Sequence, residues 1–250
     1  MANKSRTVDE NRTGSMLRVS LSSEEKFTFV WGKLSQRVTG LSDFKGGLKV
    51  YESGLEFAYD PIDGNISTTK GTVDLLYDLC TLAPNQSRGV GIILKHEVGH
   101  SIMHGAAQNY SESYSEAAAE LFAIKERGFS DLIDGIAVLM ICSKKSSQDG
   151  HNPCDTMSHY AVNMWNNKDF MQLVGRIYPE APEIAKCLPF TGPGKDGNAI
   201  LVNLAELVEI RVKEIEHDLA EAYKRIPKQL SIDFKGAESP VGNLIKPRNE

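Results

Sequence analysis

Apolar residues recur at helical spacing along several segments of the chain. The clearest of these helices is predicted to begin with a capping box formed by Ser22 and Glu25 and to stop at Gly40. Its apolar face would carry Phe27, Val30, Trp31, Leu34 and Val38. The same spacing predicts further helices over 72–82, from about 90, over 113–127, over 131–142, around 159–165 and over 200–225. The pattern therefore predicts a mainly α-helical protein.

Two short runs rich in β-forming residues lie between 48 and 59, on either side of Ser53-Gly54. Such runs separated by a turn signal predict a β-hairpin. The expected fold class is therefore α+β, mainly α-helical, with a small antiparallel β-sheet. Residues 84–89 and 143–155 are polar and turn-rich and are predicted to be loops.

The distribution of turn-forming residues predicts the organisation of the chain. We expect a flexible arm over 1–20 and a catalytic domain over 21–190. A linker and a long helix packed on that domain would follow over 191–226, and an irregular tail over 227–250.

Composition limits the classes of protein that fit. The chain has 250 residues, 41% of them hydrophobic and 24% charged, which is ordinary for a globular protein. No stretch approaches the roughly 20 apolar residues of a membrane span, and the first residues lack the apolar core of a signal peptide. We therefore expect a soluble protein. The four cysteines show no paired spacing and are expected to be reduced; they are Cys80, Cys142, Cys154 and Cys187.

A net charge of −5 without long like-charge blocks disfavours nucleic acid as the main partner. The expected partner is a protein or peptide substrate, and we expect a monomer.

The most informative motif is His96-Glu97-x-x-His100. Residues four apart lie on one face of a helix, so both imidazoles can bind one metal ion. A catalytic zinc takes three protein ligands and a water, and Glu97 is placed to take a proton from that water. The pattern also arises by chance in helices. Here, however, the surrounding segment is apolar, and buried histidine and glutamate side chains need partners.

The third ligand is sought among three downstream glutamates, Glu112, Glu116 and Glu120. Glu116 and Glu120 are four residues apart on a predicted helix and so face the same way. One can bind the metal while the other accepts a hydrogen bond from a metal-bound histidine. Small side chains at 117–119 would let this helix pack closely against the motif helix.

With these glutamates the motif resembles the gluzincin metallopeptidases. The resemblance implies a zincin-like core in which the motif helix packs on the third-ligand helix, with Glu116 as ligand and Glu120 holding a histidine. The run Glu116-x-x-Ala-Glu-x-Phe-Ala123 also resembles the ImmA/IrrE-type peptidases, although Glu120 replaces their usual asparagine. Glu120 stays the alternative ligand, since it has a thermolysin-like separation from His100. A metzincin would need other residues at Met103 and Ala106.

Several other side chains are candidates for secondary roles. His104, one turn after His100, is interpreted as a packing residue or as a partner of a ligand. A side chain that stabilises the oxyanion of hydrolysis is sought among His151, His159, Tyr110 and Tyr114. His151, Cys154 and His159 are a weaker candidate for a second metal cluster.

The motifs together predict a zinc-dependent endopeptidase, with the 48–59 hairpin as a strand on which substrate could pair. The motif position and chain size also resemble the actin-cleaving effector metallopeptidases of Legionella. That resemblance implies a virulence factor that type IV secretion delivers into host cytoplasm and that cleaves host actin. The alternatives are an ImmA/IrrE-like or phage-exclusion-like regulatory metallopeptidase and, from another class, a zinc-stabilised binding module without catalysis.

Overall fold

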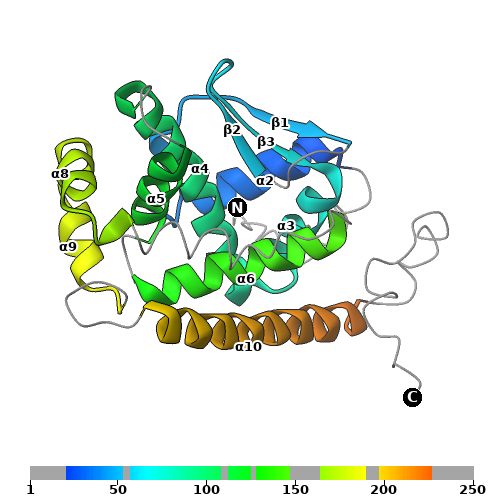
Figure 1. Cartoon of the computed structure of the whole chain (residues 1–250). Coiled ribbons are helices and arrows are strands. Elements are labelled where there is room, and N and C mark those ends of the chain that lie inside the picture. Colours follow the sequence, from blue (N-terminus) through cyan, green and yellow to red (C-terminus); the bar gives the residue numbers. More distant parts are fainter. Residues whose placement is uncertain are drawn as a thin grey trace, which may run out of the picture.

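A computed structural model describes residues 21–52, 57–107, 112–124, 128–146, 164–189 and 197–226, and helices make up most of these described residues. A three-stranded sheet lies along one side of the helices (Figure 1). The helices are α2 (Ser23–Ser35), α3 (Lys70–Thr81), α4 (Ser87–Ala107), α5 (Glu112–Ala123), α6 (Phe129–Ser146), α8 (Lys168–Ile177), α9 (Ala181–Lys186) and α10 (Gly197–Lys224). The remaining elements are β1 (Leu48–Tyr51), β2 (Phe57–Asp60), β3 (Asn65–Thr69) and the short 3-10 helices η2 (Leu41–Asp43) and η3 (Pro84–Gln86). The predicted α+β class, mainly α-helical, is confirmed at this level.

The capping box at the start of α2 is confirmed. The Ser22 hydroxyl accepts a hydrogen bond from the Glu25 amide at 3.2 Å, and the Glu25 carboxylate accepts one from the Ser22 amide at 2.7 Å. The two bonds satisfy amides that have no partner within the helix. α2 ends at Ser35, earlier than predicted, and buries Phe27, Val30 and Leu34.

The predicted antiparallel hairpin over 48–59 is wrong. The strand order is β1-β3-β2, so β3 lies between the two predicted strands. β1 pairs with β3 in parallel, with Leu48 opposite Ile66, whereas β2 pairs with β3 antiparallel, with Tyr59 opposite Ile66. The sheet is therefore mixed, and its one tight hairpin joins β2 to β3 through a turn in which Gly64 has φ +67°.

β3 was missed because its sequence, Asn-Ile-Ser-Thr-Thr, contains a single aliphatic residue. Its two threonines are nevertheless buried, and β-branched threonine suits a strand. The second of them, Thr69, also caps α3, since its hydroxyl accepts from the Thr72 amide. α3 therefore starts at Lys70, directly after the strand.

α4 lies at the centre of the molecule and contacts α5, α6, α3 and β2. Glycines allow its closest approach to α6. A methyl group added at Gly89 would lie 2.5 Å from the Asp134 carbonyl oxygen, and one added at Gly135 would lie 2.8 Å from Ile92. Because both positions lack a side chain, the two helices can pack nearly backbone to backbone.

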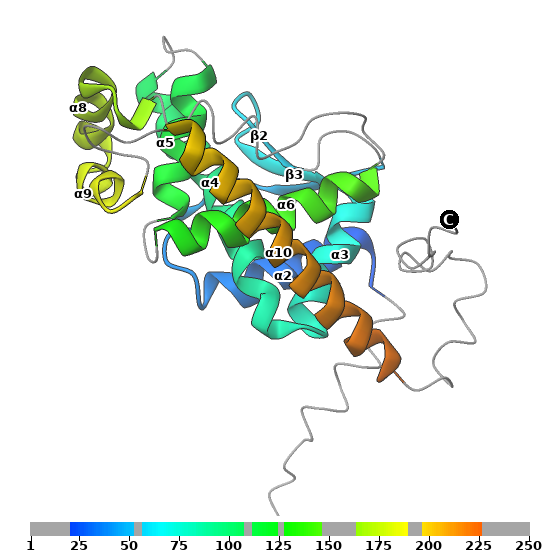
Figure 2. The same ribbon diagram turned by 60° about the horizontal axis from the view of Figure 1, so that its bottom comes forward.

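The long helix α10 lies against α6, on the side of the molecule away from the sheet (Figures 1 and 2). One face of it is buried and consists of Leu204, Val208, Val212, Ile215 and Leu219. The predicted helix over 200–225 is confirmed, with bounds a few residues different.

Other segments differ from the sequence prediction. Helix α6 continues to Ser146, so residues 143–146 of the predicted loop are helical, and α8 and α9 were not predicted. Cys80, Cys142 and Cys187 are free thiols, as expected, and Cys154 lies outside the described residues. The predicted arm over 1–20, the tail over 227–250 and residues 191–196 of the predicted linker also lie outside them. Among the helices in the described ranges, none combines the length and apolar character that a bilayer crossing requires.

Candidate metal centre

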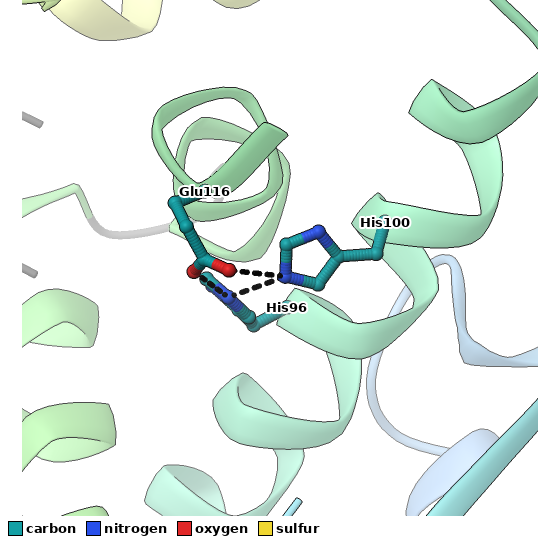
Figure 3. Close-up of side chains that lie close together, drawn as sticks. All are labelled: His96, His100 and Glu116. Atoms are coloured by element: carbon teal, nitrogen blue, oxygen red, sulfur yellow. Dashed lines mark hydrogen bonds and ion pairs between the residues drawn. The ribbon is translucent and has the colours of Figure 1, made fainter. Parts of the chain in front are cut away.

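Three potential metal ligands from two helices converge on one point (Figure 3). His96 and His100 come from α4 and Glu116 from α5. The two Nε2 atoms are 3.0 Å apart, and the Glu116 carboxylate oxygens lie 3.1 Å from His96 Nε2 and 3.3 Å from His100 Nε2. Within the described ranges, this is the one group of at least three such side chains close enough to share an ion.

The dimensions of this group suit a tetrahedral ion. When zinc binds nitrogen and oxygen at about 2.0–2.1 Å, adjacent ligand atoms lie about 3.3 Å from one another. The three separations observed here, 3.0, 3.1 and 3.3 Å, are close to that value. Three protein ligands also leave a fourth position for water or substrate. The group could therefore hold a divalent metal ion.

The second nitrogen of His96 contacts the other glutamate of α5. His96 Nδ1 lies 2.8 Å from Glu120 Oε2, and Glu120 is only 3% exposed. A carboxylate accepts hydrogen bonds, so Nδ1 carries the proton and Nε2 of a neutral His96 presents a lone pair to Glu116. Facing lone pairs are repulsive unless a proton or a cation lies between them. The arrangement therefore favours binding of positive charge.

The electrostatics of the two partners agree with that conclusion. Burial opposes the charged form of His96, but hydrogen bonds with Glu116 and Glu120 raise its pKa well above the ordinary value. Burial also opposes ionisation of Glu116, yet hydrogen bonds from His100 and His96 hold the pKa of that carboxyl far below its usual range. Without a metal, the group thus retains a proton on His96 beside an ionised Glu116.

Glu97 is 6% exposed and lies one residue along α4 from His96. Burial raises the pKa of its carboxyl, while the two neighbouring histidines lower it by a smaller amount. A carboxylate with a raised pKa accepts a proton more readily, as a general base must. A bound cation would lower that pKa again.

Ser115 is a contact that the sequence reasoning missed. Its hydroxyl lies 2.8 Å from His100 Nδ1. α5 runs antiparallel to α4, so that Glu120 meets His96 while residues near Glu116 meet His100. An antiparallel α5 brings residues near Glu116 beside His100. Which of these residues faces the ring depends on the rotation of α5 about its axis, and the spacing of residues along the sequence does not fix that rotation.

Close packing of α4 and α5 sets these distances. A methyl group added at Gly99 would lie 2.7 Å from the Ala119 Cα and 3.0 Å from its carbonyl oxygen. Residues 117–119 are all buried, in agreement with the expectation that small side chains bring the helices together. Trp165 makes a further contact with α5, in which its indole N–H donates to the Ala117 carbonyl at 3.0 Å.

The other candidates lie away from this group or outside the described residues. The His104 ring packs edge-on against Tyr59, with centroids 6.3 Å apart, as expected for a packing residue. Tyr114 packs against Phe170 at 5.2 Å and, two residues before Glu116, lies on another face of α5. Outside the described side chains are Glu112, Tyr110, His151, Cys154 and His159.

Comparison with known proteins identifies no relative of this chain. No protein-family model matches the chain, and no curated protein or solved structure matches it significantly. What can be concluded about function therefore rests on the geometry of α4 and α5. These helices bring together a His-His-Glu group that could bind a metal ion.

Proposed function

We propose that the protein is a zinc-dependent endopeptidase of the gluzincin type. His96, His100 and Glu116 would hold the metal, and Glu97 would act as the general base. The observation that supports this most directly is the convergence of three ligand atoms beside a buried carboxylate. Zinc is the proposed ion because the three ligand atoms have the separations of a tetrahedral site, and zinc prefers tetrahedral coordination by ligands such as imidazole and carboxylate.

The chemistry would be hydrolysis of a peptide bond. Bound zinc supplies a Lewis acid that activates water and polarises the scissile carbonyl. Glu97 takes a proton from the water while the water oxygen forms a bond to the carbonyl carbon. When the C–N bond breaks, Glu97 passes that proton to the leaving amine, so the same side chain acts first as base and then as acid.

The position of β2 supports an extended peptide as substrate. β2 is an edge strand of the sheet and contacts α4, whereas the other edge strand, β1, contacts α2. A substrate chain that added to β2 would gain main-chain hydrogen bonds beside the metal group. The role expected for the 48–59 segment is thus proposed for β2 alone.

A zinc-stabilised binding module is the alternative from another class. Structural zinc sites usually take four protein ligands. In the described part of the chain, three ligands converge, and a buried glutamate adjoins them. Burial of a carboxylate costs free energy, which is easier to explain when the carboxylate has a chemical role.

The substrate proposal comes from the resemblance to actin-cleaving effectors of the RavK type. On that basis we propose host actin as the protein that is cleaved, after delivery into the host cytoplasm by type IV secretion. Regulatory peptidases of the ImmA/IrrE or phage-exclusion kind would instead cleave a bacterial protein.

The test is proteolysis of purified actin and of eukaryotic and bacterial cell lysates, with wild type, Glu97→Gln and wild type plus a zinc chelator. Glu97→Gln should lower the cleavage rate at least about 100-fold, because it removes the base. It should leave zinc affinity within a few-fold of wild type, because it removes no ligand. Glu206→Gln, an exposed change on α10, is the matched control and should cleave normally.

Each result points to one hypothesis. An actin fragment made only by active protein supports the effector proposal, and a fragment of another protein supports a peptidase with a different substrate. Zinc binding without any cleavage, equal in wild type and Glu97→Gln, would favour the binding module.

A further inference from the structure

His100 has a hydrogen-bond partner that lies on the helix supplying the third ligand. Its Nδ1 atom is 2.8 Å from the hydroxyl oxygen of Ser115, the residue directly before Glu116 on α5. A serine inside a helix often bonds a carbonyl of its own helix. Here the hydroxyl reaches an imidazole on another helix.

The direction of this bond follows from the positions of the ring nitrogens. His100 directs Nε2 toward His96 and Glu116, 3.0 and 3.3 Å away (Figure 3). For Nε2 to present a lone pair to a metal, the proton of a neutral imidazole must lie on Nδ1. The Ser115 hydroxyl oxygen accepts that N–H. The bond therefore holds the orientation of the ring, and it is compatible with the tautomer that a metal on Nε2 requires.

The two histidines are thus held by chemically different groups from one helix. His96 donates to the buried Glu120 carboxylate, and His100, with Nε2 free to face an ion, donates to a neutral hydroxyl. With two carboxylate partners, another negative charge would stand beside the ion and weaken its pull on a bound carbonyl. A hydroxyl orients the second ring without adding that charge.

We propose that Ser115 is a positioning residue of the metal centre, which holds His100 with Nε2 toward the ion by accepting a hydrogen bond from Nδ1. The inference rests on the proposed metal function, and it adds a residue that acts through His100 without touching the ion. It assigns α5 three separate contacts with the histidines of α4, through Ser115, Glu116 and Glu120.

The experiment compares zinc affinity in wild type, Ser115→Ala and Ser115→Thr by competition with a chromophoric chelator. The visible absorption of the cobalt-loaded proteins reports the coordination geometry. Loss of a partner that orients a ligand weakens metal binding by about 10- to 100-fold. Ser115→Ala should therefore bind zinc at least about 10-fold more weakly and change the cobalt spectrum, and Ser115→Thr should recover most of the affinity because it retains the hydroxyl.

The matched control is Ser101→Ala. Ser101 is adjacent to His100, but its hydroxyl donates to the Val98 carbonyl of its own helix at 2.7 Å. This variant should bind zinc like wild type. Far-UV circular dichroism and urea unfolding of the metal-free proteins establish that all variants are folded.

The outcomes separate this inference from the proposed function. If wild type binds zinc and Ser115→Ala matches it in affinity and spectrum, the role of Ser115 is overturned. A loss in Ser115→Ala that Ser115→Thr does not recover assigns the effect to packing and overturns it as well. Zinc binding that depends on Ser115, without peptidase activity in any assay, overturns the proposed function and leaves the role of Ser115 intact. Wild type that does not bind zinc overturns both.

Discussion

His96 contacts a carboxylate through each of its ring nitrogens. Glu120 lies at Nδ1 and Glu116 at Nε2, at 2.8 and 3.1 Å. Both contacts favour the protonated ring, and they outweigh the burial that disfavours it. In the metal-free protein, a proton thus occupies a position that an ion would take. Metal binding must displace that proton, and this makes the affinity depend on pH.

We expect zinc affinity to continue rising with pH above 7. A histidine with an ordinary pKa near 6.5 is already neutral there and would no longer compete with metal. The pKa of His96 is raised, so raising the pH toward that pKa should still increase the zinc affinity, by up to about tenfold for each pH unit. Competition titrations with a fluorescent chelator between pH 6 and 8.5 measure this slope.

Glu120→Gln provides the control for the pH dependence. It removes the negative charge at Nδ1, so the pKa of His96 should fall and the slope above pH 7 should flatten. An affinity that is already constant above pH 7 in wild type would show that His96 is neutral without metal.

At the level of elements, the group of His96, His100 and Glu116 depends on how closely α4 and α5 approach each other. Gly99 faces the backbone of Ala119, and a methyl group there would lie 2.7 Å from the nearest atom. Both obstructing atoms nearest to it, the Ala119 Cα and carbonyl oxygen, belong to the backbone, so no side-chain rotation could make room. The glycine within the motif therefore sets the distance from which Ser115, Glu116 and Glu120 reach the histidines.

Gly99→Ala should separate α4 and α5 without altering any ligand. We expect a loss of about 1–3 kcal/mol in the free energy of unfolding, as for other overpacked interiors. Zinc affinity should fall by about 10-fold or more, because displaced partners no longer orient the ligands. Urea unfolding and chelator competition measure the two effects.

Gly71→Ala is the matched control for this change. Gly71 is an exposed glycine on α3 with no atom within 4 Å of the added methyl group. Alanine there should stabilise the helix by about 0.5–1 kcal/mol and leave zinc affinity unchanged. If Gly99→Ala behaved in the same way, the close approach would not control the metal group.

Sequence reasoning recovered the elements whose pattern is local. The capping box of α2 and the apolar face of α10 are visible in the residues themselves, and both were predicted. The order of the strands was not, because β3 depends on two threonines buried by tertiary packing and not on an alternating apolar pattern. Ser115 was missed for a related reason, since the rotation of α5 against α4 is set by contacts such as Gly99 with Ala119.

At the scale of the whole molecule, α10 is fixed to the rest of the fold by polar contacts as well as by its apolar face. Arg211 donates to Asp134 of α6 at 2.7 Å and to Gln86 of η3 at 2.5 Å. Gln86 in turn donates to Asp218. Farther along α10, Tyr223 donates to Asp78 of α3. The helix thus links α3, η3 and α6.

Removing the charge of Arg211 should destabilise the protein. Arg211 is 23% exposed and Asp134 16%, so Arg211→Met would leave a largely buried carboxylate without its cation. Breaking one side of a buried pair costs about 3–5 kcal/mol, and the remaining exposure should bring the cost to about 2–4 kcal/mol. Urea unfolding followed by circular dichroism measures the change.

Lys213→Met, on the same helix, is the control. Lys213 pairs with Glu209, and both are more than two-thirds exposed, at 69% and 67%. An exposed pair contributes less than about 1 kcal/mol, so this variant should unfold almost like wild type. Equal losses in the two variants would mean that Arg211 acts through general helix propensity and not through its buried partners.

The bonds of Gln86 also have a consequence for synthesis of the chain on the ribosome. Its side-chain partners on α10 come 125 and 132 positions later, whereas the histidine partners on α5 follow their histidines by 15 to 24 positions. At roughly 5–20 residues per second, translation separates these events by on the order of ten seconds. The nascent protein thus passes through a stage in which α4 and α5 can already meet, while α10 has yet to be made.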